Sequence, residues 1–314
     1  MAKLKLNPGR GPISKKVISS AQKALKRKII DISELRKAKI RAEDLEKTII
    51  SEEGLSEYDP LHAVYIYGQN KISVFIEQIA ELPGISKLTN AYVHAEDLYM
   101  PSGPPMSPLT KSYFTCWAYF DLCAGIKKES LGTVAIDVCK FFNVDEGLIR
   151  VFENMQNSRM GFYVHEGISG NCVSLRELIT DKKIQAIVPS GYLGNTGEIW
   201  CARIMPEPLE GFGYSVVFIT PYVIGEVKGD KFYPISNEGD WLTFFDRNLD
   251  KTGIKEKILA YESFMKYGLE RNYWNEYIFE AYVNHRHDMI WLTGFPDIPL
   301  SKPHSKESQE RMGL

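Results

Sequence analysis

The sequence lacks any apolar run long enough to cross a lipid bilayer. Its longest apolar runs, such as 216–219 and 64–66, fall far short of the about 20 residues that a transmembrane helix needs. The basic N-terminus is followed by amphipathic sequence instead of the apolar centre of a signal peptide. We therefore expect no membrane span, no secretion and a cytoplasmic location.

Motifs that mark a catalytic site are absent too. The five cysteines are widely spaced and include no Cys-x-x-Cys pair, which excludes a zinc ribbon or a redox dithiol of that type. There is no Gly-x-Ser-x-Gly nucleophile motif. The glycine-rich run 191–197 precedes a predicted strand, whereas a phosphate loop needs a helix N-terminus there. These absences favour a protein that is not an enzyme and has no cofactor, with reduced cysteines in its core.

Acidic residues are missing from the first thirty positions, which hold nine lysines and arginines. The whole chain has a formal net charge of -2, so a basic N-terminal segment precedes an acidic remainder. Val17, Ala21, Leu25 and Ile29 follow one another at intervals of four, which predicts an amphipathic helix with Ser14 as its N-cap. Such a charge division is typical of an arm that binds a partner.

The polar side of this helix carries the candidate binding residues. They are Lys15, Lys16, Lys23, Lys26, Arg27 and Lys28. Lysine-rich helices bind phosphates or carboxylates without reading sequence, so the expected partner is nucleic acid or an acidic protein. The apolar side is narrow and has no aromatic residue, so we expect no membrane partner.

A second helix is predicted from Ser33 to about residue 50. Its apolar residues Leu35, Ala38, Ala42 and Leu45 alternate spacings of three and four, as in paired helices and coiled coils. The segment is too short for a long coiled coil. It predicts either an αα-hairpin with the first helix or a contact in a homo-oligomer.

The rest of the chain predicts an α+β fold. Helical periodicity covers 59–80, 108–124, 130–142 and 145–157, with a mixed loop between the first two. Short β-rich runs between residues 160 and 220 and a hairpin at 225–234 predict an antiparallel unit that is barrel-like or a bent sheet. Helices at 239–249, 253–267 and 270–285 are expected to cover it. The predicted regions are a basic arm or αα-hairpin (1–50), a helical region (51–158), an antiparallel β unit (159–236), C-terminal helices (237–301) and a disordered tail (302–314).

Two patterns support an alternative function, a metal-dependent hydrolase of the phosphodiesterase or nuclease kind. His285, His287 and Asp288 lie at the end of a predicted helix and can share a divalent metal only if the helix ends between the histidines. Glu226 and Lys228 match half of a magnesium nuclease site. Each pattern also has a structural interpretation, because cations favour helix C-termini and charged hairpins protect sheet edges.

One further pair, His165 and Glu166, stands at a predicted strand end and is a candidate acid and base. No nucleophile accompanies it. The sequence as a whole therefore predicts a non-enzymatic binding or adaptor protein that docks through its basic arm, with the metal-dependent hydrolase as the alternative.

Overall fold

The computed structural model describes residues 10–26, 50–82, 84–99, 111–208, 210–228, 231–234, 236–269, 281–285 and 290–293, and the single residues 36, 40, 44 and 47. The chain divides into two compact units. Unit 1 comprises residues 1–95 and 116–157, and unit 2 comprises residues 96–115 and 158–314.

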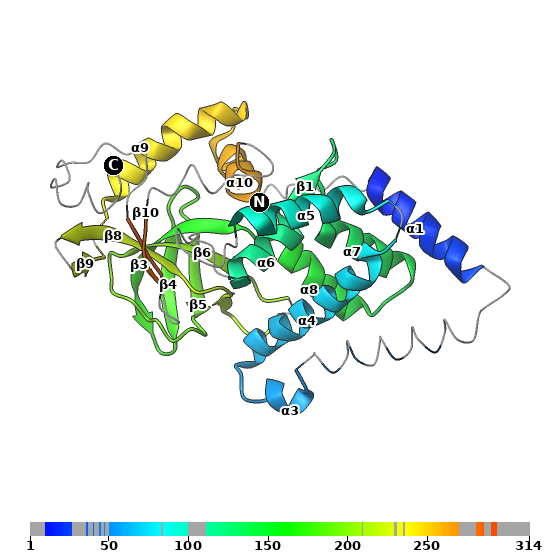
Figure 1. Cartoon of the computed structure of the whole chain (residues 1–314). Helices are drawn as coiled ribbons and strands as arrows, with labels where there is room; N and C mark the ends of the chain where they lie inside the picture. Colours follow the sequence, from blue (N-terminus) through cyan, green and yellow to red (C-terminus); the bar gives the residue numbers. More distant parts are fainter. Residues whose placement is uncertain are drawn as a thin grey trace. The chain divides into compact units, whose positions relative to one another are not determined.

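Unit 1 is built from helices around α7 (Leu131–Phe141), which contacts α1, α4 and α8 (Figure 1). A two-stranded hairpin, β1 (Cys123–Ala124) and β2 (Glu129–Ser130), comes directly before α7. The other helices that lie in this unit wholly or in part are α1 (Pro12–Leu25), α3 (Glu52–Leu55), α4 (Pro60–Ala80), α5 (Ser86–Tyr99), α6 (Lys111–Phe120) and α8 (Glu146–Asn157).

Helix ends in unit 1 are fixed by side-chain caps. Asp59 accepts hydrogen bonds from the amides of Leu61 and His62 at the start of α4. Ser130 and Thr133 form a capping box at the start of α7. Ser130 also donates to the buried side chain of Gln156, which ties α8 to the start of α7.

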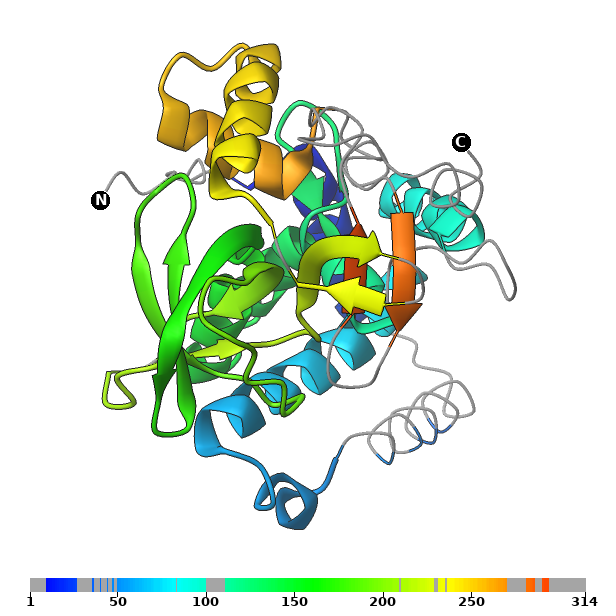
Figure 2. The ribbon, with the colours of Figure 1, turned by 90° about the vertical axis from the view of Figure 1, so that its left-hand side faces the viewer.

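Unit 2 contains a closed five-stranded barrel. Its strands pair in the order β6, β3, β4, β5 and β7, and β7 pairs back onto β6. Figure 2 shows the strongly curved strands of this region in green. All pairs in the ring are antiparallel except β5 with β7, which is parallel. The strands are β3 (Met160–Ser169), β4 (Cys172–Glu177), β5 (Lys183–Ile187), β6 (Ile199–Met205) and β7 (Ser215–Val217).

Further strands extend the sheet beyond the ring. β8 (Tyr222–Lys228) pairs with β6 and with its hairpin partner β9 (Lys231–Tyr233). β8 also pairs in parallel with β11 (Ile290–Thr293), and β11 pairs with β10 (Ala281–His285). The barrel interior is filled by alternate residues of its strands, such as Tyr163, Val173, Leu175 and Trp200.

Two helices cover one side of the barrel, α9 (Glu238–Leu249) and α10 (Lys257–Tyr267), which are joined through a short 3₁₀ turn at Asp250–Thr252. Phe162, on the outer side of β3, lies 5.0 Å from Trp241 and 5.2 Å from Phe245, measured between ring centroids. These aromatic contacts bury the apolar faces of the helices, as the sequence predicted for this region.

The α+β fold with its central barrel-like unit is confirmed, and four local predictions are wrong. Ser14 lies inside α1 rather than at its N-cap, which is Gly11. The expected loop after α4 contains α5, whose apolar periodicity is weak. Residues 121–124 leave the helix predicted for 108–124 and enter β1. Residues 281–285 form strand β10 instead of the end of a helix, because β11 joins them to β8, some sixty residues away in sequence.

No helix in the described part of the chain is long and apolar enough to cross a membrane. All five cysteines are free thiols, and Cys116, Cys123, Cys139 and Cys201 are buried. Burial raises the pKa of the Cys139 thiol to about 11, so this residue is a neutral core group, as expected from the sequence.

Candidate functional site

Helix α1 packs on unit 1 through one apolar face. Ile13, Val17 and Ile18 are buried, and Val17 is completely shielded from solvent. Their partner is α7, which runs beside α1 (Figure 1). Residues 12–25 of the basic arm therefore form a helix that is docked on its own unit, and this contact fixes the orientation of the helix.

A carboxylate from the β1–β2 hairpin caps the start of α1. The backbone amides of Ile13 and Ser14 donate to the two carboxylate oxygens of Glu129, at 3.0 and 2.9 Å. Glu129 is only 5% exposed, and Gly11 leaves room for its carboxylate, because a Cβ at that position would collide with it. A negative charge on free amides at a helix N-terminus is favourable, so Glu129 anchors α1.

The opposite side of α1 carries only basic and neutral groups. Lys15, Lys16, Lys23 and Lys26 are all exposed. At 100° per residue they fall within an arc of about 100°, and they extend along about 16 Å of the helix. Among the described residues, no acidic group forms an ion pair with any of them. We call these four residues the lysine face.

At the start of α1, unlike at the lysine face, cationic and acidic groups lie near one another. The guanidinium of Arg10 lies 5.0 Å from the centre of the Phe141 ring, at the end of α7. Burial raises the pKa of the nearby Asp137 carboxyl, and Arg10 and Lys140 oppose the shift. The lysine face therefore stands apart from the acidic residues that lie beneath the helix.

Comparisons with models of protein families, with curated protein sequences and with solved structures gave no match to this chain.

Unit 2 holds a buried polar cluster beneath the loop between β5 and β6. His165 is 1% exposed, and its Nε2 lies 2.8 Å from the carbonyl oxygen of Leu193, so Nε2 carries the proton. The carboxyl group of Glu198, also buried, accepts hydrogen bonds from Tyr192, Asn195 and the indole of Trp200. Burial lowers the pKa of His165, although the Leu193 carbonyl and Glu198 oppose the shift.

This cluster holds the loop between β5 and β6 in place. Gly194 has a φ of 65°, and a Cβ there would lie 2.5 Å from the Trp200 ring. Glu166 points to the other side of β3, where it pairs with Arg176 and Lys183. Both residues therefore lie inside β3 instead of at the predicted strand end, and their side chains face opposite ways, so they do not form an acid and base pair.

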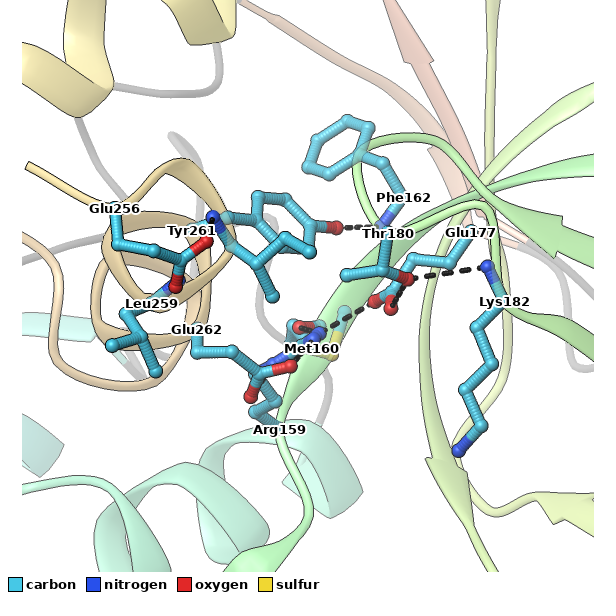
Figure 3. A network of polar contacts seen from close by, with 11 residues as sticks. Arg159, Met160, Phe162, Glu177, Thr180, Lys182, Glu256, Leu259, Tyr261 and Glu262 are labelled. Atoms are coloured by element: carbon cyan, nitrogen blue, oxygen red, sulfur yellow. Dashed lines mark hydrogen bonds and ion pairs between the residues drawn. The ribbon is translucent and has the colours of Figure 1, made fainter. Parts of the chain in front are cut away.

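A second buried network joins α10 to the barrel (Figure 3). Arg159 donates to both carboxylate oxygens of Glu262, at 3.0 and 2.6 Å, and to Glu177 at 2.7 Å. Although burial disfavours its charge, these carboxylates raise the pKa of Arg159 well above its usual value. Tyr261 accepts a hydrogen bond from the amide of Phe162 and lies against the Arg159 guanidinium. Every strong polar group here faces another one, which indicates a structural role.

The outer face of β4 and β5 offers no platform for stacking bases. Ser174 and Gln185 are hydrogen-bonded across the strands at 2.7 Å, and Arg176 pairs with Glu166, Asp181 and Glu238. The outward residues of these strands are Cys172, Ser174, Arg176, Lys183, Gln185 and Ile187. Barrels that bind single strands use aromatic residues at such positions, so this face is a poor candidate.

The metal candidates are only partly described. His287 and Asp288 lie outside the described residues, and His285 belongs to a strand instead of a helix end. Glu226 and Lys228 lie in the β8–β9 hairpin, opposite Tyr233 and Lys231, as the sequence predicted for the backbone. No group of three potential metal ligands occurs among the described residues.

Further polar and aromatic side chains of the two units have structural contacts, while part of the basic segment is not described. Glu207 accepts from the amides of Phe212 and Gly213 and so closes its own loop. The aromatic residues of α6, from Tyr113 to Phe120, are buried and belong to the core. Arg27, Lys28 and most of the segment 33–50 lie outside the described residues; within that segment Arg36, Ile40 and Asp44 have helical backbone.

Glu129 is the functional residue that the sequence did not reveal. It lies more than one hundred positions from the amides that it caps. No local sequence pattern marks such a contact. Because Glu129 stands just before α7, the sequence alone suggests equally well that it caps α7.

Proposed function

We propose that this chain is a non-enzymatic binding or adaptor protein whose lysine face docks on a polyanion, either nucleic acid or an acidic protein. The observation that carries the proposal is the orientation of α1. Its apolar face and its first turn are occupied within unit 1, which leaves Lys15, Lys16, Lys23 and Lys26 together in solvent.

Two physical arguments support this use of the lysine face. Four positive charges on one rigid helix attract anionic partners over a distance set by the Debye length, about 8 Å at physiological salt. A docked helix also loses less conformational entropy on binding than a free arm does. Arg27 and Lys28 follow directly in the sequence and are proposed to extend the surface.

The proposal is tested by titrating labelled duplex DNA and poly-L-glutamate with the full chain over a series of salt concentrations. The test variant replaces Lys15, Lys16, Lys23 and Lys26 by Gln. The expected result is loss of binding at physiological salt. For duplex DNA, the slope of log affinity against log salt should fall by about 0.9 for each phosphate that the variant no longer neutralises.

The matched control replaces four exposed lysines of unit 2, Lys182, Lys183, Lys255 and Lys257, by Gln. It removes the same charge from the chain and should retain the affinity and most of the slope. Equal weakening by the two variants would mean that only net charge matters, and the proposal would be wrong.

A further inference from the structure

We infer that the partner of the lysine face is an acidic protein surface with an apolar pocket, and that Ile126 enters this pocket. The inference rests on the proposed function and assigns its partner class. Ile126 stands at the tip of the β1–β2 hairpin and is 95% exposed. Lys127, beside it, is exposed as well.

The hairpin presents Ile126 rigidly. Its base is buried, since Leu122, Cys123 and Ser130 are each at most 3% exposed. The turn is tight: Gly125 has a φ of 72°, Lys128 has a φ of 50°, and the amide of Lys128 donates to the Gly125 carbonyl at 3.2 Å. A side chain held in this way loses little entropy when it is buried by a partner.

The hairpin lies at the end of α1 where the lysine face begins. Glu129, three residues after Ile126, is bonded to the first turn of α1. Three residues span no more than about 11 Å of chain, so Ile126 lies close to the start of the lysine face. An apolar residue next to several cations has the arrangement of a protein interface, in which an apolar centre is bordered by charged groups.

Nucleic acid fits this surface less well. Phosphates gain nothing from an exposed isoleucine, and the lysine face has no arginine or aromatic residue to contact bases. Carboxylates satisfy the lysines equally well, and a protein can add the apolar pocket. Charge complementarity and the apolar tip together therefore point to an acidic protein.

The test compares three probes of defined composition: poly-L-glutamate, a glutamate–leucine copolymer with the same number of carboxylates, and duplex DNA. The full chain should bind the copolymer at least about tenfold more tightly than polyglutamate, because the tip buries apolar surface only with the copolymer. The variant Ile126→Thr should lose this preference and keep its affinity for polyglutamate and DNA. The matched control, Ile168→Thr, changes an isoleucine of β3 that is 51% exposed and should keep the preference.

Three outcomes overturn the inference. If Ile126→Thr retains the preference, or if the full chain has none, the tip does not contact the partner. If Ile126→Thr weakens DNA binding by the same factor, the tip is a nucleic-acid contact. Failure of the proposed function itself is distinct, because the four-lysine variant would then bind all three probes as tightly as the unchanged chain.

Discussion

Replacing Glu129 by Ala should release α1 from unit 1. The change removes two hydrogen bonds to helix amides, at 3.0 and 2.9 Å, and a negative charge at a helix N-terminus. Loss of a cap costs about 1 kcal/mol, and loss of the favourable charge about 0.3–1 kcal/mol more. The total of about 1.3–2 kcal/mol corresponds to a population of the detached helix that is about 10-fold to 30-fold larger.

Hydrogen exchange measured for the α1 amides tests this number. The amides of Val17 and Ile18, in the buried face, should exchange about 10-fold to 30-fold faster in Glu129→Ala, while those of α8 stay unchanged. Glu146→Ala, which removes an exposed acid from the first turn of α8, is the matched control. Unchanged protection of α1 in Glu129→Ala would refute the anchoring role of the carboxylate.

Three further results are expected. Arg159→Met should lower the free energy of unfolding, measured in urea, by about 3–5 kcal/mol, because it leaves Glu177 buried without its cation. A loss below about 1 kcal/mol would contradict the structural role of the network. His165→Gln should flatten the fall in stability that occurs as the pH drops below about 6.5. Because burial lowers the pKa of His165 in the folded state, the unfolded chain binds the proton more tightly, so the stability that His165 contributes is present above that pH and lost below it. An identical dependence of stability on pH in the two proteins would contradict this. Elemental analysis of protein purified without chelator should find no stoichiometric zinc, manganese, iron or nickel, and a stoichiometric metal would instead favour the hydrolase and its histidine cluster.

Local patterns were sufficient for the elements that each bury one periodic face. The spacing in α1, α7 and α8 follows the helical repeat, and the short runs from 160 to 220 alternate as strands do, so these elements and the α+β class were predicted correctly. Closure of the barrel through the parallel pair β5–β7 depends on contacts between distant residues, and the sequence pattern favoured antiparallel pairing alone.

The candidate site was predicted only in part. The lysines of α1 were found because charge and helical period are local properties. Their anchoring by Glu129 and the exposed Ile126 were not, since both depend on a hairpin that lies in the middle of a segment rich in apolar residues. The histidine and glutamate at 165 and 166 were paired by adjacency, although a strand sends neighbouring side chains to opposite faces.

The most direct test of the central claim is lysine acetylation of the full chain, read by mass spectrometry with and without poly-L-glutamate. The account predicts that Lys15, Lys16, Lys23 and Lys26 become protected when polyglutamate is bound, while Lys182 and Lys183 react as before. Equal reactivity of all these lysines in the bound and free protein would contradict it.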